Sequence, residues 1–239
     1  MREQDQRTAL LIGEAGIHKL REARVVVVGL GGVGGYAVEA LVRAGIGKLT
    51  LVDFDTVQES NLNRQIIAEH GSIGLAKTDL FEQRAIRLNP EVRLIIHRLF
   101  ADQSNFAEFL HEGMLLVDAI DSLEAKVGLL EYAFGKAIPC VSVFGAGNRL
   151  DPSKIRSGDL SESSGCPLGR RVRKALRERG VTTGIRVVYS IEEPLPSISN
   201  QDRQADSTTQ KSPIGSISYM PGIMGLWAAS EIIRIILDR

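Results

Sequence analysis

Cysteine is scarce in this chain of 239 residues, which contains only Cys140 and Cys166. Two cysteines cannot form the disulfide framework of a small secreted protein, and they cannot supply the two Cys-x-x-Cys pairs of a structural zinc site. An excess of charge is missing as well, because 29 Lys and Arg residues balance 29 Asp and Glu residues. This balance excludes a generally basic nucleic-acid-binding surface, although it does not exclude a local basic patch.

The sequence also lacks an uninterrupted hydrophobic stretch that could cross a membrane. Its most apolar late segment, residues 219–237, is broken by Pro221, Glu231 and Arg234, and a spanning helix needs about 20 consecutive apolar residues. The first seven residues are polar and lack the hydrophobic region of a signal peptide. We therefore expect a cytoplasmic protein without stable membrane association.

The composition is typical of an α/β enzyme, with 44% hydrophobic, 24% charged and 5% aromatic residues. Buried strands and amphipathic helices alternate along the first part of the chain. We predict strands at 24–28, 48–52, 92–97, 114–120 and 139–143, and helices at 36–44, 74–89, 105–111 and 122–136. This order indicates an α/β fold with a Rossmann-like, mostly parallel, doubly wound sheet.

The alternation changes after residue 145, and we assign residues 1–145 to the nucleotide-binding region and 146–239 to a C-terminal extension of the same domain. We expect this extension to continue the sheet with antiparallel strands. Its predicted elements are strands at 151–160, 184–191 and 214–219, a basic helix at 168–179, a mobile polar loop at about 192–213 and a terminal helix from Pro221.

A glycine-rich motif lies between the first strand and the first helix of the alternating region. The glycines let the backbone approach phosphates, and the following helix N-terminus provides N–H donors. Asp53 ends the next strand, 53 − 34 = 19 residues after the last motif glycine, where a carboxylate can accept hydrogen bonds from ribose. A glycine turn made only for helix packing is the alternative. The motif alone leaves open whether a dinucleotide or ATP binds. Its glycines are Gly29, Gly31, Gly32 and Gly34.

Polar residues that follow the motif favour ATP over a dinucleotide. Asn61, Arg64 and Gln65 form a polar block after the second strand, Lys77 begins the next helix, and Asp121 follows the 114–120 strand. Cations can neutralise phosphate oxygens, and a carboxylate can hold a divalent ion such as Mg²⁺. Each of these residues taken alone is also consistent with a solvated surface group.

Together these motifs, over residues 7–160, resemble the ubiquitin-activating-like adenylyltransferases, which include the molybdopterin-synthase and thiazole sulfur-carrier adenylyltransferases. The resemblance implies that Asp53 binds ribose, that Asn61, Arg64 and Lys77 contact phosphates, and that Asp121 holds magnesium. We count Arg64, Lys77 and Asp121 as catalytic. The four motif glycines, Asp55 and Gln65 complete the ATP site. The family also implies a homodimer in which an N-terminal arginine, here Arg7, reaches the ATP of the partner subunit.

The second half of the chain is similar to the tRNA threonylcarbamoyladenosine dehydratase subfamily, in segments 151–160, 166–180 and 215–225. This resemblance implies adenylation of the threonylcarbamoyl carboxylate on a tRNA adenosine, followed by cyclisation. A sulfur-carrier adenylyltransferase is one alternative, and a non-catalytic dinucleotide-binding module or dehydrogenase is another. A sulfur-relay partner and a monovalent cation remain open.

The basic helix gives an independent indication of a nucleic-acid partner. At 100° per residue its cations share one face, opposite Leu168, Val172 and Leu176. Residues 149–179 contain nine Lys or Arg and four Asp or Glu, so this segment carries a net charge of 9 − 4 = +5. We predict phosphate contacts to tRNA, with an ordinary solvated face as the alternative. The predicted contact residues are Arg170, Arg173, Lys174 and Arg177.

Overall fold

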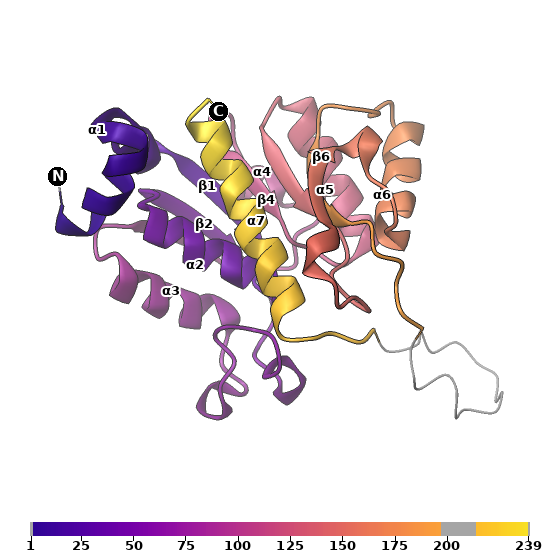
Figure 1. The fold of residues 1–239 in the computed structure, drawn as a ribbon, viewed down its shortest axis with the longest axis horizontal. Coiled ribbons are helices and arrows are strands. Elements are labelled where there is room, and N and C mark those ends of the chain that lie inside the picture. Colours follow the sequence, from indigo (N-terminus) through magenta and orange to yellow (C-terminus); the bar gives the residue numbers. More distant parts are fainter. Residues whose placement is uncertain (1, 197–213, 239) are drawn as a thin grey trace.

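The structure is a computed structural model that describes residues 2–196 and 214–238. It contains one seven-stranded sheet with strand order β3-β2-β1-β4-β5-β7-β6 (Figure 1). The strands are β1 (Arg24–Val28), β2 (Lys48–Val52), β3 (Arg93–His97), β4 (Leu115–Asp118), β5 (Cys140–Val143), β6 (Ile155–Asp159) and β7 (Arg186–Ser190). All neighbouring strands pair in parallel except β6 and β7, which are antiparallel. The predicted α/β fold class is therefore confirmed.

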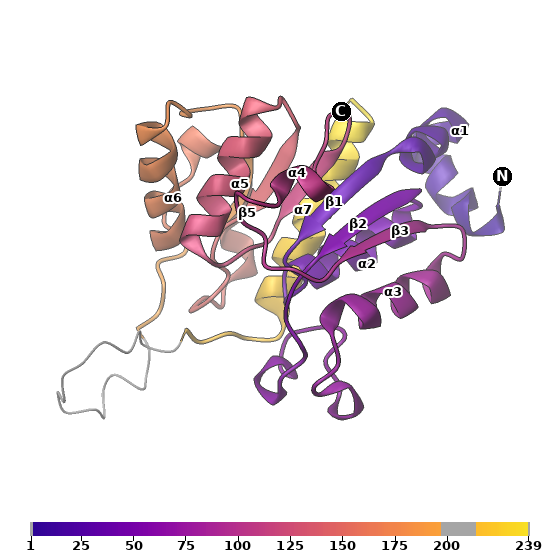
Figure 2. The same ribbon diagram turned by 180° about the vertical axis from the view of Figure 1, so that it is seen from behind.

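Helices cover both faces of the sheet (Figures 1 and 2). The α-helices are α1 (Gln6–Glu22), α2 (Gly34–Ala44), α3 (Lys77–Leu88), α4 (Phe106–Phe109), α5 (Leu123–Gly135), α6 (Pro167–Glu178) and α7 (Tyr219–Ile236). Short 3-10 helices lie at η1 (Glu3–Asp5), η2 (Glu59–Asn61), η3 (His70–Ser72), η4 (Pro152–Lys154) and η5 (Leu160–Glu162).

Two hydrophobic cores lie on the two sides of the sheet, as the alternation of side chains along β1 shows. Val25 and Val27 belong to the core formed with α2, α3 and α7. Val26 and Val28 belong to the core formed with α4, α5 and α6. Burial on both faces explains why the strands are continuous runs of apolar residues.

The predicted strand at 214–219 is wrong. Residues 214–217 form no strand, and α7 already begins at Tyr219. The backbone of this segment bonds to loops instead of a sheet edge, because Gly215 exchanges hydrogen bonds with Asn148. The beginning of the predicted mobile loop, residues 192–196, has no helix or strand, and its remainder lies outside the described residues.

No helix within residues 2–196 and 214–238 is long and apolar enough to span a bilayer. The apolar terminal helix α7 is instead packed along α2, where Gly225 allows the close approach of the Val33 carbonyl.

Candidate nucleotide-binding site

The predicted site residues follow three adjacent strands at the carboxyl edge of the sheet. The glycine motif follows β1, Asp53 follows β2, and Asp121 lies three residues after β4. Because β1 pairs with both β2 and β4, the loops after these strands lie next to one another. Ligands of open α/β sheets bind at this edge.

The glycine loop is so close to its surroundings that side chains would not fit at two positions. Gly29 has a φ of 89°, a left-handed conformation that favours glycine, and a Cβ there would lie 2.7 Å from the Ala119 carbonyl oxygen. A Cβ on Gly34 would lie 1.8 Å from the Gly29 carbonyl oxygen. The loop can therefore turn tightly into α2, whose N-terminus lies at the carboxyl edge of the sheet. The glycine loop and the loops after β2 and β4 border a region at this edge, which we call the crevice.

Asp53 is buried beside this loop, with 8% of its surface exposed. Its carboxylate accepts hydrogen bonds from the Leu30 N–H at 2.5 Å and from the Asp55 N–H at 2.8 Å. Burial raises the pKa of Asp53 above its ordinary value, and these two hydrogen bonds and the charge of Lys77 offset this effect only in part. Asp53 thus supports the glycine loop and offers its remaining acceptor capacity to a ligand.

Lys77 is the first residue of α3, and only 5% of its surface is exposed. Its ammonium group lies 2.8 Å from the Asp55 carboxylate. The structure therefore brings Asp53, Asp55 and Lys77 together, as the sequence predicts. Burial makes Lys77 different from a solvated surface ion, which was the alternative for this residue.

The polar block after β2 packs against the glycine loop. Asn61 accepts a hydrogen bond from the Gln58 N–H, and Arg64 donates to the carbonyl of Ser60 and to Asn63. Gln65 is buried, and its Oε1 has no hydrogen-bond partner among the described residues. A Cβ on Gly31 would lie 3.7 Å from the Gln65 side-chain nitrogen, and a Cβ on Gly32 would lie 3.3 Å from Arg64 Cγ.

Asp121 completes the crevice on the β4 side. Its side chain is exposed and makes no hydrogen bond or ion pair with any residue that the structure describes. Arg7 is exposed too, but it lies on α1, which leads into the amino end of β1 and lies away from the carboxyl ends of the strands (Figure 1). The structure thus does not bring Arg7 together with the other predicted residues of its own chain.

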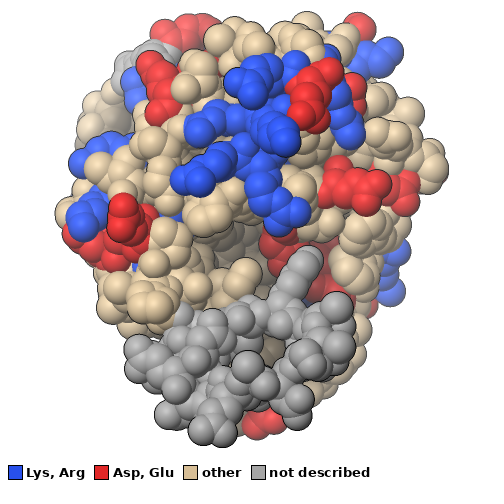
Figure 3. Space-filling model, turned by 90° about the vertical axis from the view of Figure 1, so that its right-hand side faces the viewer, with Lys and Arg blue, Asp and Glu red and all other residues tan. Residues whose placement is uncertain are grey.

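The cations of α6 form a patch on the side of the molecule shown in Figure 3. Arg170, Lys174 and Arg177 are exposed, whereas Val172 and Leu176 are buried on the opposite face of the helix. The amphipathic pattern of this helix is confirmed.

Two arginines of α6 differ from the sequence-based assignment. Arg173 is half-buried, and its guanidinium donates to the Ser163 hydroxyl at 2.8 Å. Arg171, which the helical projection left out of the cationic face, is exposed. The patch offered to a ligand therefore consists of Arg170, Arg171, Lys174 and Arg177, with Arg173 anchoring the preceding loop.

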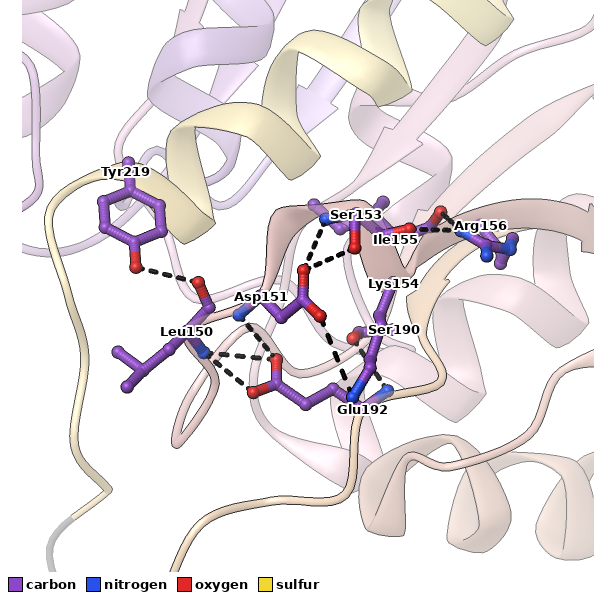
Figure 4. A network of polar contacts seen from close by, with 9 residues as sticks. All are labelled: Leu150, Asp151, Ser153, Lys154, Ile155, Arg156, Ser190, Glu192 and Tyr219. Carbon is purple, nitrogen blue, oxygen red and sulfur yellow. Dashed lines mark hydrogen bonds and ion pairs between the residues drawn. The ribbon is translucent and has the colours of Figure 1, made fainter.

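Sequence reasoning missed a polar network around the loop after β5 (Figure 4). Glu192 accepts hydrogen bonds from the backbone N–H groups of Leu150 and Asp151, and the Tyr219 hydroxyl donates to the Leu150 carbonyl. These contacts join the loop after β5 to the segment after β7 and to the start of α7. Their partners are about 40 to 70 residues apart in sequence, and no local pattern indicates such pairs.

Sequence reasoning also missed an aromatic pair next to Asp53. Phe54 and Phe100 are 59% and 46% exposed, and their rings pack edge to face with centroids 5.1 Å apart. The sequence could have indicated Phe54, because this residue lies inside the Asp-x-Asp motif. The pair forms an exposed apolar surface that begins one residue after Asp53.

Neither cysteine is placed for thiol chemistry. Cys140 is buried in β5, and burial raises the pKa of its thiol to about 12. Cys166 is 5% exposed and its sulfur accepts a hydrogen bond from the Gly169 N–H at the start of α6. Both side chains thus serve packing or capping.

The crevice fits ATP and Mg²⁺ by the chemistry of its residues. A glycine cradle, a helix N-terminus and two cations suit a polyphosphate, and the buried unpaired Oε1 of Gln65 provides a further polar contact. Mg²⁺ commonly binds through one or two carboxylates together with substrate phosphates and water. Asp121 is a suitable carboxylate, and no cluster of three or more potential metal ligands occurs within the described residues.

The fold and the residues at the carboxyl edge of the sheet define a Rossmann-like protein whose glycine loop, helix N-terminus and cations suit a nucleotide polyphosphate. The sequence matches the ThiF family over residues 4–239, and the chain belongs to that family.

Relatives with assigned activities match the chain along nearly its whole length. It is 32% identical to the tRNA threonylcarbamoyladenosine dehydratase of Bacillus subtilis (strain 168), covering 99% of this chain and 96% of the relative. It is 39% identical to the Escherichia coli (strain K12) dehydratase, with 97% and 92% coverage. The structure is also similar to crystalline E. coli TcdA in complex with ATP, with a TM-score of 0.88, 32% identity and coverage of 99% and 95%.

Proposed function

We propose that this protein is an ATP-dependent dehydratase that cyclises threonylcarbamoyladenosine in tRNA. The observation that carries this proposal is the crevice itself. The glycine loop, the cations Arg64 and Lys77 and the exposed carboxylate of Asp121 follow adjacent strands at one sheet edge, in a chain that matches the dehydratases over nearly its whole length.

The reaction begins with a carboxylate, which is a poor electrophile because its oxygen is a poor leaving group. One carboxylate oxygen attacks the α-phosphorus of ATP, and the bond to pyrophosphate breaks. A nitrogen or oxygen of the carbamoyl group then attacks the acyl carbon. AMP leaves with the former carboxylate oxygen, so the substrate loses the elements of water while ATP becomes AMP and pyrophosphate. This sequence needs positioning and charge neutralisation, but no nucleophile from the protein.

The chain's own residues take these roles. Asp53 accepts hydrogen bonds from the ribose hydroxyls, and the glycine loop with Asn61 and Gln65 binds phosphates. Arg64 and Lys77 neutralise charge that develops on the phosphate oxygens. A magnesium ion held by Asp121 would supply further charge neutralisation at the phosphates.

The protein works as a cytoplasmic homodimer in this proposal. α1 contains a break at Gly13, whose φ and ψ of 72° and 174° are not helical. The segment before it projects Leu10 and Leu11, which are 87% and 78% exposed. A partner subunit would cover these leucines, and Arg7 on the same segment would reach the ATP of that partner.

Pyrophosphate release tests this function against its alternatives. We expect ATP-dependent release with tRNA that contains threonylcarbamoyladenosine, but none with a sulfur-carrier protein and none with unmodified tRNA. Release only with a carrier protein would favour the sulfur-carrier adenylyltransferase, and no release with either would favour a non-catalytic module. Alanine at Arg64, Lys77 or Asp121 should reduce the rate by about 10²-fold or more. Arg87→Ala, an exposed position on α3, is the control and should keep the wild-type rate.

A further inference from the structure

A buried ion pair lies directly behind the crevice and has no part in the proposed chemistry. Lys126 of α5 and Asp118, the last residue of β4, are both 0% exposed, and their charged atoms are 2.6 Å apart. Ser142 of β5 donates its hydroxyl proton to the same carboxylate oxygen at 2.6 Å. Lys126 also donates to the Ser142 hydroxyl at 3.2 Å and to the Val143 carbonyl at 3.0 Å.

The second oxygen of Asp118 determines the turn that leads to Asp121. It accepts a hydrogen bond from the Ile120 N–H at 3.1 Å. The intervening Ala119 donates its N–H to the Val28 carbonyl at 2.9 Å, and its own carbonyl lies close to Gly29. The turn is therefore fixed at one end by a buried carboxylate and in the middle by the glycine loop.

A buried pair of this kind is weak evidence for a role in stability alone. Removing two charges from water is costly, and well-packed apolar residues of similar volume are often as stable or more stable. What apolar residues cannot do is hold a carboxylate oriented toward a backbone N–H. Here the oriented carboxylate is Asp118, and the backbone that it orients ends in Asp121.

We propose that Lys126 and Ser142 are positioning residues for the binding of magnesium and ATP, acting through Asp118 on the turn that presents Asp121. This inference rests on the proposed function, because it assigns to Asp121 the magnesium site of that function. Neither residue touches the nucleotide. Their effect is to hold the Asp121 carboxylate in one place relative to the phosphate cradle.

The chain contains a similar group away from the crevice that serves as a matched control. Glu231 of α7 is buried, and its carboxylate accepts hydrogen bonds from the Ser157 hydroxyl at 2.8 Å and from Arg186 at 2.7 Å. It joins α7 to β6 and β7 at the far end of the sheet. A variant that weakens this cluster should lower stability without altering the magnesium site.

The test compares Lys126→Met and Ser142→Ala with Arg186→Met and Ser157→Ala. ATP binding is measured by equilibrium dialysis over a range of Mg²⁺ concentrations and also with a chelator, and Tm is measured for each variant. We expect Lys126→Met to raise the Mg²⁺ concentration needed for half-maximal binding by about 10- to 100-fold. Ser142→Ala should shift it in the same direction by a smaller factor. Binding with the chelator should change little, and the two control variants should lower Tm without this shift.

The failures of the two proposals are distinguishable. Wild-type protein that binds ATP without any dependence on Mg²⁺ would contradict the proposed magnesium site itself. Wild-type protein with the expected dependence, together with Ser142→Ala and Lys126→Met variants that match their controls, would overturn only the positioning role. If Lys126→Met does not fold, Ser142→Ala decides, since it removes one hydroxyl and leaves the ion pair in place.

Discussion

At the scale of single residues, the glycine loop has the least room for change. A methyl group on Gly34 would overlap the Gly29 carbonyl oxygen, and only a shift of the loop backbone could relieve it. We expect Gly34→Ala to lower the free energy of unfolding by about 1 to 3 kcal/mol and to weaken ATP binding at least about tenfold, as measured by calorimetry. Gly71→Ala is the matched control, because no atom lies within 4 Å of the added Cβ. Equal ATP affinity in both variants would contradict a phosphate cradle at this loop.

Residues of the crevice differ in how far sequence could predict them. Asp53 and Lys77 were predictable, because each lies at the end of a strand or the start of a helix whose pattern is local. The partnership of Asp118 with Lys126 and Ser142 was not, since it depends on how α5 and β5 pack behind β4. The hydrogen bond between Arg173 and Ser163 was not predictable for a related reason. The helical period predicts which way the Arg173 side chain points, but it does not predict that Ser163 lies there and accepts its hydrogen bond.

At the scale of elements, α7 is joined to the antiparallel end of the sheet by Glu231. Burial would raise the pKa of this carboxyl, but the hydrogen bonds from Ser157 and Arg186 outweigh it and hold the pKa below the ordinary value of 4.5. The stability that this group contributes is therefore present above pH 4.5 and lost as the pH falls through its lowered pKa. We expect Glu231→Gln to lower the free energy of unfolding at neutral pH by roughly 1 to 3 kcal/mol.

Urea denaturation at several pH values measures this effect. The difference between wild type and Glu231→Gln should narrow as the solution becomes strongly acidic, because both carry a neutral side chain there. A difference that stays constant down to acidic pH would show that the charge of Glu231 is not what stabilises this junction.

The helix α6 carries the predicted contact with tRNA. Charge reversal at two exposed positions, Arg170→Glu and Lys174→Glu, should weaken tRNA binding and reduce its dependence on salt, while ATP affinity stays the same. A filter-binding titration over a range of salt concentrations measures both quantities. The control reverses two exposed arginines of α3 and β3, Arg87→Glu and Arg93→Glu, and has the same net charge. An equal loss of tRNA affinity in both double variants would show that α6 does not contact tRNA specifically.

Local sequence patterns suffice to predict some of the strands and helices, but not all of them. The βα alternation up to residue 143 follows from apolar runs and helical periods, and each predicted strand there exists. The predicted strand at 214–219 is wrong although Ile217 and Tyr219 alternate with serines as in a strand. The backbone of this segment is bound instead by Asn148 and Asn63 from neighbouring loops. Long-range partners of this kind leave no local pattern.

At the scale of the whole molecule, the account requires two subunits. Arg7 lies apart from the crevice of its own chain, so a contact with ATP would come from a partner. Mixing Arg7→Ala with Lys77→Ala tests this, because a hybrid dimer contains one site with both residues intact. Random exchange should restore about a quarter of the wild-type rate, since half of the dimers are hybrids with one working site of two. If sedimentation shows dimers and the rate does not recover after mixing, Arg7 is not part of the partner's site.

The central claim is that the protein uses ATP to remove water from threonylcarbamoyladenosine in tRNA. Mass spectrometry of nucleosides tests it most directly, on modified tRNA incubated with the protein, ATP and Mg²⁺ and digested afterwards. The account predicts that threonylcarbamoyladenosine is replaced by a nucleoside lighter by one water molecule, with AMP formed in equal amount. It predicts no conversion without ATP or with the Asp121→Ala variant. Unchanged threonylcarbamoyladenosine in the presence of active, ATP-binding protein would contradict it.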